Sequence, residues 1–383
     1  MRLPVLDIPG RRPEPRAPTV AQTSFDTGPR SIGAVQMLRV SLTDRCNFRC
    51  LYCMPAGGVE WLPAPDLLTD HEILAVVRAA AAVHGIRRFK LTGGEPTLRP
   101  GLVGLVKALR ETGDADDLSM TTNGMLLEKL AKPLRDAGLD RVTVSVDSLR
   151  PDRFRRITRT GDLATVLRGL DRAEGVGFRS VKINCVVMRG VNDDEVADFA
   201  RLTLSRRVSV RFIEYMPLGD AAVMSAEPVA GQVLDESETG PAGGCGAQDR
   251  GDVFVPEGAV RQSIEGPLGP LVPVDRGTEA GVGPAVMYRL SRGEPRGRVG
   301  FISAMSAPFC ATCNRLRLTA EGQFRTCLFA LDETDLRGPM RDGASDDELE
   351  GLIRAAVWAK WSGHRVNHPD FVQPARSMSA IGG

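Results

Sequence analysis

The sequence predicts an α/β fold, on two observations. Between residues 37 and 217, six short apolar segments alternate with segments of helical periodicity. Regular β–α alternation is typical of a parallel sheet with helices on its outside. Six such units are too few to close an eight-stranded barrel. We therefore expect a partial (β/α)6 barrel of the TIM type.

Each expected element follows from local patterning. Alternating or continuous apolar residues between turn signals predict the strands, and apolar residues at helical spacing predict the helices. The expected strands are 38–42, 88–92, 118–123, 141–147, 181–188 and 208–215. The expected helices are 70–83, 102–110, 128–137, 163–173 and 194–204.

Alternation within the strands predicts what the barrel encloses. Leu38, Val40 and Leu42 share one face of their strand and would pack beneath the helices. The opposite face is polar on every strand, with Arg39, Ser41, Lys90, Thr92, Ser119, Thr121, Asn123, Thr143, Ser145, Asp147, Lys182, Asn184, Ser209 and Arg211. Unpaired charges are costly to bury, so we expect an open lumen that holds a polar ligand. The alternative is a solvent-exposed sheet face, which parallel sheets seldom have.

The first strand leads into a tight cysteine run. Cys46, Cys50 and Cys53 have the spacing C-x3-C-x2-C. Three thiolates on one loop can hold three irons of a [4Fe-4S] cube and leave the fourth open for a substrate. Tyr52 adds an aromatic flank that helps to exclude water. Zinc is the weaker alternative because structural zinc takes four ligands, and three cysteines cannot pair off as disulfides.

The rest of the chain divides by composition. We expect a disordered Pro/Arg-rich extension at 1–36, the barrel at 37–217, a Gly/Pro-rich linker and insert of weak structure at 218–300, and a C-terminal cysteine-bearing region at 301–383. The extension has no apolar core of a signal peptide, and no apolar run predicts a membrane span. Cys245 is expected to be an unligated surface thiol.

A second cysteine triplet follows in the C-terminal region. Cys310, Cys313 and Cys327 have the spacing C-x2-C-x13-C. His364 or His368 could complete a zinc site, and this alternative stays open on spacing alone. Arg315 and Arg317 stand between these cysteines. A guanidinium can bind two phosphate oxygens at once, in a bidentate contact. The alternative is a solvated basic turn, which could have the same sequence.

The motifs together resemble known enzymes. The segment C-N-F-R-C-L-Y-C-M-P resembles the signature of radical S-adenosylmethionine (SAM) enzymes. The segments F-C-A-T-C-N-R-L-R-L-T and R-T-C-L-F, with the chain end S-A-I-G-G, resemble the GTP 3′,8-cyclase family. Further support comes from K-L-T-G-G-E-P at 90–96, T-T-N-G at 121–124, V-S-V-D-S-L at 144–149 and R-F-I-E-Y-M at 211–216.

The resemblance implies a chemistry that needs no catalytic side chain. It implies two [4Fe-4S] clusters and SAM as cofactors, with Cys46, Cys50 and Cys53 on the first cluster and Cys310, Cys313 and Cys327 on the second. A radical from SAM would start the conversion of GTP to (8S)-3′,8-cyclo-7,8-dihydroguanosine 5′-triphosphate, the first step of molybdenum cofactor biosynthesis. The fold expectation becomes a radical SAM barrel with a C-terminal second-cluster extension. His364 and His368 would then be ordinary residues.

The resemblance also implies binding residues. Tyr52, Gly94, Ser145 and Met216 match positions that bind SAM. Arg39, Lys90, Thr121, Lys182, Arg315, Leu316, Arg317, Gly382 and Gly383 match positions that bind GTP or enter its site. Position 90 is often Arg in the family, so the contact of Lys90 is the least secure of these. Alone, each cation could equally form an ion pair, and a terminal Gly-Gly could equally be frayed.

The expected partners follow from composition and resemblance. A net charge of +1 argues against a general nucleic-acid surface. We expect a cytoplasmic enzyme without membrane contact, which takes GTP, receives electrons from a flavodoxin or ferredoxin type donor and passes its product to cyclic pyranopterin monophosphate synthase. A homodimer is left open. The alternatives are a peptide-modifying radical SAM enzyme with an auxiliary cluster, a non-catalytic iron-sulfur electron carrier and a zinc-stabilised binding module.

Overall fold

The computed structural model describes residues 35–216, 218, 253–275, 283–360, 366, 371, 372, 374, 376 and 378–382. Expectations for the extension up to residue 34, and for Cys245, His364, His368 and Gly383, lie outside this part of the chain. Among the described residues, no helix has the length and apolar character needed to cross a membrane.

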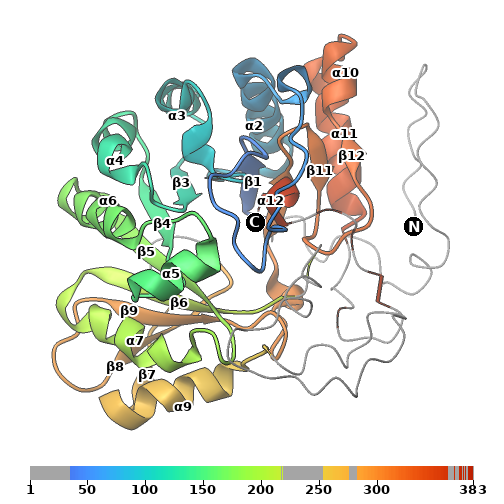
Figure 1. Cartoon of the computed structure of the whole chain (residues 1–383). Coiled ribbons are helices and arrows are strands. Elements are labelled where there is room, and N and C mark those ends of the chain that lie inside the picture. Colours follow the sequence, from blue (N-terminus) through green and yellow to red (C-terminus); the bar gives the residue numbers. More distant parts are fainter. Residues whose placement is uncertain are drawn as a thin grey trace.

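Six neighbouring parallel strands form the barrel wall, as predicted. They are β1 (Met37–Ser41), β2 (Arg88–Thr92), β3 (Asp117–Thr122), β4 (Arg141–Ser145), β5 (Ser180–Val187) and β6 (Val208–Glu214). The helices that cover the outside are α2 (Asp70–His84), α3 (Leu102–Glu111), α4 (Leu127–Asp136), α6 (Leu163–Gly175) and α7 (Val196–Ser205) (Figure 1). The prediction of a partial (β/α)6 barrel is confirmed.

Local signals explain where these helices begin and end. Thr69 accepts a hydrogen bond from the Glu72 backbone N–H, and the Glu72 side chain accepts one from Thr69, a capping box at the start of α2. Gly85 ends α2 in the left-handed conformation, which glycine adopts without steric cost. The apolar face of the same helix, including Ile73 and Val76, is fully buried against the sheet.

The expected alternation also holds. Leu38, Val40 and Leu42 on the outer face are at most 1% exposed and belong to the main hydrophobic core. Because successive side chains in a strand point to opposite faces, the polar residues between them point into the barrel. The core thus lies between the sheet and its helices, and the lumen is left to polar groups.

The expectation of weak structure across 218–300 is wrong for the described part of that segment. It contains α9 (Glu257–Leu268), β7 (Leu271–Pro273), β8 (Val286–Leu290) and β9 (Arg298–Ile302). β9 pairs in parallel with β6 and antiparallel with β8, so the sheet continues past the barrel. These strands are short and separated by Gly and Pro, and only the pairing of β9 with β6, distant in sequence, joins them to the barrel. Another element without a prediction, α5 (Pro151–Thr158), has only eight residues and many charges.

The C-terminal region extends the other edge of the sheet. β10 (Arg315–Leu318) pairs in parallel with β1, and β11 (Gln323–Arg325) and β12 (Thr334–Asp335) follow it antiparallel. The described residues form one twelve-stranded sheet in the order β12-β11-β10-β1-β2-β3-β4-β5-β6-β9-β8-β7. Two further helices, α10 (Arg337–Arg341) and α11 (Asp346–Trp358), lie beside α2 (Figure 1).

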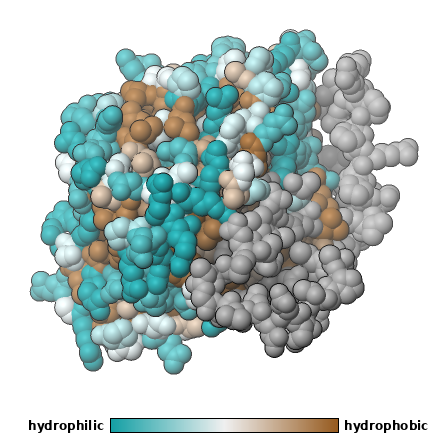
Figure 2. Space-filling view, viewed as in Figure 1, coloured by the Kyte–Doolittle hydropathy of each residue, from teal (hydrophilic) through white to brown (hydrophobic). Residues whose placement is uncertain are grey.

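The remaining short elements lie near the barrel mouth. They are the 3₁₀ turns η2 (Ala64–Asp66), η3 (Pro96–Leu98), η4 (Asp193–Glu195) and η7 (Cys310–Thr312), and the terminal helix α12 (Met378–Ile381). Figure 1 shows α12 next to β1, in the middle of the molecule. On the face seen in Figure 2, hydrophilic residues cover much of the described surface, with hydrophobic residues between them.

Candidate active site

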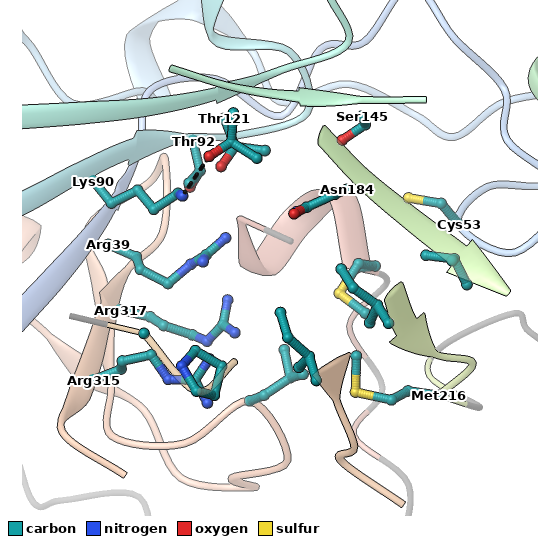
Figure 3. A pocket seen from close by; sticks show the side chains of 18 of the residues that line it. Arg39, Cys53, Lys90, Thr92, Thr121, Ser145, Asn184, Met216, Arg315 and Arg317 are labelled. Carbon is teal, nitrogen blue, oxygen red and sulfur yellow. Dashed lines mark hydrogen bonds between the residues drawn. The ribbon is translucent and has the colours of Figure 1, made fainter. Parts of the chain in front are cut away.

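A cavity of about 330 Å³ occupies the lumen. Both cysteine triplets line it, together with polar residues from β1 to β6 and from β10. Figure 3 shows the side chains of Arg39, Arg315 and Arg317 on one side of the cavity, and those of Cys53, Ser145 and Met216 on the other. The cavity therefore has a cationic side and a side next to the first triplet.

Backbone contacts with α5 fix the loop of the first triplet. The N–H groups of Arg49 and Leu51 donate to the carbonyls of Thr158 and Ile157, at 3.0 Å each. The guanidinium of Arg159 donates to the carbonyls of Arg49 and Met54, at 2.9 and 3.0 Å. Arg159 has φ of +61°, the only positive value among described residues other than glycine. The strained backbone at Arg159 is thus retained where its side chain closes the loop.

Tyr52 ties the same loop to the barrel strands. Its hydroxyl donates to Asp147 at 2.7 Å, and Asp147 also accepts from the Val186 backbone N–H at 2.9 Å. Burial raises the pKa of Asp147 to about 6, although both hydrogen bonds act to lower it. Tyr52, expected to exclude water and to contact SAM, thus also anchors the loop to β4 and β5.

The glycine pair after β2 packs against the start of the triplet loop. A Cβ atom on Gly94 would lie 2.3 Å from the Asp44 carbonyl oxygen, so no larger residue fits without a shift of backbone. Gly94 donates to the Thr43 carbonyl at 2.7 Å. The absence of a side chain at Gly94 therefore lets the backbone approach the protein's own loop closely. Gly94 also lines the cavity.

Glu95 links that turn to the next strand. Its buried carboxylate accepts from the Asn123 backbone N–H and the Thr122 hydroxyl, at 2.7 Å each. The Asn123 side chain in turn donates to Asn47 on the triplet loop at 2.7 Å. These bonds join the ends of β2 and β3 to the first triplet.

Cations surround the second triplet. Cys310 and Cys313 lie on and just after η7, and the Arg315 guanidinium reaches the Cys313 sulfur at 3.9 Å. Lys360 donates to the Arg315 carbonyl at 3.3 Å. Burial would raise the pKa of the Cys313 thiol, but Arg315 and Lys360 outweigh it and lower that pKa to about 7.

The donor set fits iron-sulfur clusters. All six cysteines are half-buried, unpaired with one another and exposed to the same cavity. In the part of the chain that the structure describes, no three or more His, Cys, Asp or Glu side chains gather closely enough to hold a single metal ion. In a [4Fe-4S] cube the cysteine thiolates bind separate irons, so they need not converge on one point.

Several buried cations lie close together on the cationic side of the cavity. Burial, followed by Arg317 and Arg315, lowers the pKa of Arg39 well below its usual range. Burial and Arg315 lower the pKa of Arg317 to about 9. Lys90 has its pKa lowered by burial and by Arg211. Crowded cations of this kind favour an anionic ligand, which would restore their charged forms.

Polar groups near these cations bond within the lumen. Lys90 and Arg211 both donate to the Thr143 hydroxyl, at 3.3 and 3.2 Å, and Arg211 donates to Asn184 at 3.0 Å. The buried hydroxyl of Thr121 has no hydrogen-bond partner in the described part of the chain. A ligand in the lumen would provide one.

The chain end reaches the cationic side. The Gly382 carbonyl accepts from Arg317 at 2.8 Å and from Arg39 at 3.3 Å. A Cβ atom on Gly382 would lie 2.7 Å from the Thr92 hydroxyl, and its φ is +77°. Only glycine suits both the space and the backbone conformation.

The structure brings most of the expected site residues together. Those that line the cavity are Cys46, Cys50, Cys53, Cys310, Cys313, Cys327, Tyr52, Gly94, Ser145, Met216, Arg39, Lys90, Thr121, Lys182, Arg315 and Arg317. Leu316 does not, because its side chain alternates to the outer face and is fully buried in the core. Its assignment to the substrate site is wrong for the side chain.

Some lining residues had no assigned role. Arg141, Asn184, Arg211 and Phe309 also face the cavity. Strand alternation correctly predicted that Asn184 and Arg211 face the lumen, and the same signal could have marked them as candidate binding residues. Phe309 stacks beneath Arg315, with the guanidinium carbon 4.9 Å from the ring centre, and no local pattern announces this contact.

Two protein families match parts of this chain. Residues 40–203 match the radical SAM superfamily, and residues 237–366 match the family described as Molybdenum Cofactor Synthesis C. Among solved structures, methylornithine synthase is 16% identical over 48% of this chain and 54% of that chain, with a TM-score of 0.39.

Curated relatives match along nearly their whole length. The GTP 3′,8-cyclase of Streptomyces coelicolor is 43% identical over 346 residues, which cover 90% of this chain and 93% of that protein. The GTP 3′,8-cyclase of Pelotomaculum thermopropionicum is 44% identical over 349 residues, 91% of this chain and 98% of that protein.

Proposed function

This chain belongs to the GTP 3′,8-cyclase family, and from that premise we propose how its cavity works. The chain is a radical SAM lyase that acts in the first step of molybdenum cofactor biosynthesis, with GTP as substrate and with an iron-sulfur cluster and SAM as cofactors. The product is (8S)-3′,8-cyclo-7,8-dihydroguanosine 5′-triphosphate. The cavity shared by two cysteine triplets and a cationic wall carries the proposal.

The side next to the first triplet is proposed as the SAM site. Cys46, Cys50 and Cys53 would hold one [4Fe-4S] cluster, which supplies, when bound, the electron that cleaves SAM. Tyr52, Gly94, Ser145 and Met216 would hold SAM beside it. The support is that all of these line the cavity, and that Cys53, Ser145 and Met216 lie on the side away from the arginines (Figure 3). The loop that carries the three cysteines is fixed to α5, β4 and β5.

The opposite side is proposed as the GTP site. The triphosphate would meet Arg39, Lys90, Lys182, Arg315 and Arg317, while Thr121 would gain the partner its hydroxyl lacks. Cys310, Cys313 and Cys327 would hold the second [4Fe-4S] cluster near the base. These residues bind and orient the substrate, and the enclosed lumen excludes water from radical chemistry.

Gly382 and Gly383 are proposed to complete the GTP side. Gly382 already bonds the guanidiniums of Arg39 and Arg317, which would hold them oriented for the substrate. Deleting both glycines should therefore remove cyclised product and leave uncoupled SAM cleavage and iron content largely intact. A truncated protein that makes product at the wild-type rate would show that the tail is only frayed.

Metal analysis tests the proposal most directly. Anaerobically purified protein should contain about eight irons with matching sulfide, which corresponds to two clusters of four. A content of about four irons together with zinc would indicate that the second triplet binds zinc instead of a cluster. With GTP, SAM and dithionite, the protein should form 5′-deoxyadenosine and the cyclised nucleotide together. Absence of that nucleotide from iron-loaded protein would overturn the function.

The remaining assignments complete the proposal. The electron donor would be a small flavodoxin or ferredoxin type protein in the cytoplasm, and cyclic pyranopterin monophosphate synthase would consume the product. A homodimer is one possible assembly, which sedimentation would establish. The domain boundaries at 36, 217 and 300 also stay predictions.

A further inference from the structure

An ion-pair cluster joins the C-terminal tail to the body of the protein. Arg376 lies just ahead of α12. Its Nε and Nη2 atoms lie 2.5 and 2.8 Å from the two carboxylate oxygens of Glu333, a bidentate contact. Its Nη1 atom bonds the carboxylate of Glu321. None of these three residues lines the cavity.

The two carboxylates belong to the sheet edge. Glu321 lies in the turn between β10 and β11 and is 7% exposed. Glu333 directly precedes β12 and also pairs with Arg325 on β11. A carboxylate as buried as that of Glu321 is costly to leave without a cation. The cluster therefore gives Arg376 one defined position relative to β10, the strand that carries Arg315 and Arg317.

The tail beyond Arg376 has little stability of its own. α12 has four residues, about one turn, and a helix that short does not persist without outside contacts. Yet it contacts both sides of the cavity. The Ser379 backbone N–H bonds the sulfur of Cys53, and the Gly382 carbonyl accepts from Arg39 and Arg317. Ile381 is 1% exposed.

We propose that Arg376 is a positioning residue that seats the tail. Its contacts with Glu321 and Glu333 fix the start of α12, so that Ser379 reaches the first triplet and Gly382 reaches the lumen guanidiniums. Arg376 acts through the tail and touches no substrate. This inference rests on the proposed role of Gly382 at the GTP site.

A purely structural role of Arg376 makes a different prediction. If the ion pairs only stabilise the β11–β12 edge, losing them would add to the effect of removing the tail. If Arg376 acts through the tail, losing it has no further effect once Gly382 and Gly383 are gone. A double-variant comparison separates the two roles.

The experiment compares four iron-loaded proteins: wild type, Arg376→Ala, the variant lacking Gly382 and Gly383, and the combination. Hydrogen exchange of peptides that span 376–382 is measured by mass spectrometry, and GTP binding is measured by calorimetry. Arg376→Ala should speed tail exchange by at least about tenfold. It should weaken GTP binding by the same factor as the deletion does, and the combination should weaken it no further. Arg376→Lys should lie between, because an ammonium cannot make the bidentate contact.

Matched variants keep the test decisive. Arg341→Ala removes another Arg–Glu contact of the C-terminal region, with Glu72 of α2, and should leave tail exchange unchanged. If Arg376→Ala does not retain iron, Glu333→Gln removes the bidentate carboxylate and should also speed tail exchange.

Tail exchange at the wild-type rate in both Arg376→Ala and Glu333→Gln would overturn the inference, as would additive losses of GTP affinity in the combination. Wild-type protein that makes no cyclised nucleotide would contradict the proposed function. If Arg376→Ala still speeds tail exchange in that case, the role of Arg376 in positioning the tail is supported independently.

Discussion

The two cysteine triplets share one cavity but stand in opposite electrostatic surroundings. Burial raises the pKa of Cys46 to about 11, with the Glu95 carboxylate adding to it. Burial and the neighbouring Cys46 raise that of Cys53 to about 12. At the second triplet, Arg315 and Lys360 lower the pKa of Cys313 to about 7 against the effect of burial.

The two triplets differ both in the contacts that hold them in place and in the charge of the ligand that each would attract. Hydrogen bonds to α5, β4 and β5 fix the first loop, whose surroundings carry the Asp147 and Glu95 carboxylates. The second lies among guanidiniums that would attract an anionic substrate. We propose that the same set of three thiols serves two purposes, because the residues around the thiols, and not the sulfurs, set the local charge.

The largest expected effect tests whether the first triplet is needed for SAM cleavage and the second for cyclisation. Cys46→Ala should abolish SAM cleavage, because the proposed SAM cluster loses a ligand. Cys310→Ala should leave some cleavage but no cyclised nucleotide. Each variant should retain about four irons. The assay is chromatography of 5′-deoxyadenosine and nucleotide products. Equal SAM cleavage by wild type and Cys46→Ala would end the distinction.

A second prediction concerns the thiols in iron-free protein. At pH 7 about half of Cys313 should be thiolate, against roughly one part in 10⁴ at Cys46, given pKa values of about 7 and 11. Iodoacetamide should therefore modify Cys313 at least about tenfold faster. The Cys313 rate should rise with pH and level off above about 8, while the Cys46 rate should still be rising there.

Peptide mass spectrometry measures both rates. Arg315→Gln should raise the pKa of Cys313 and slow its modification at pH 7, because Arg315 is the charge that lowers this pKa most. Equal rates at the two triplets would mean that their surroundings do not differ as described.

A third prediction concerns the charge of the second side. Arg315→Ala and Arg317→Ala should each weaken GTP binding by about 1.5–3 kcal/mol, the range for hydrogen bonds to charged groups. SAM binding should hardly change. Calorimetry on iron-loaded protein measures both ligands, with Arg261→Ala, which removes a contact with Tyr288, as the matched loss of a guanidinium. GTP affinity that survives both substitutions would put the triphosphate elsewhere.

The smallest effect concerns how the first loop is held. Arg159→Ala removes two bonds to loop carbonyls and should lower the free energy of unfolding by about 1–3 kcal/mol. Arg159→Gly should cost about 1 kcal/mol less, because glycine accepts a φ of +61° without strain. Thermal unfolding of iron-loaded protein compares them, with the exposed Arg168→Ala as control. If Arg159→Gly is less stable than Arg159→Ala, the backbone at Arg159 is not strained as described.

Sequence patterning predicted the barrel because its signals are local. The strand expected at 88–92 coincides with β2, and the apolar alternation of β1 correctly separated Leu38 from Arg39. β7, β8 and β9 were missed because they are short and join the sheet only through the pairing of β9 with β6, which lies far away in sequence. Short strands without such context resemble loops.

The same alternation rule explains most of the site. It placed Arg39, Lys90 and Lys182 in the lumen, where they line the cavity. Applied to β10, it would also have separated Leu316 from Arg315 and Arg317. What patterning could not give are contacts across the chain. Arg376 with Glu333, and Ser379 with Cys53, depend on distances that only the folded protein sets.

The pairing of β1 with β10 affects how this protein is made. β1 leaves the ribosome long before β10, the strand that covers its outer edge. Until β10 follows, the edge of β1 offers unpaired N–H and C=O groups to other nascent chains, a known route to aggregation. Arg39 and Arg317 become neighbours in the same pairing step. The cationic side of the cavity is thus assembled only after β10 has been synthesised, so we expect chaperones to matter most for this enzyme during that interval.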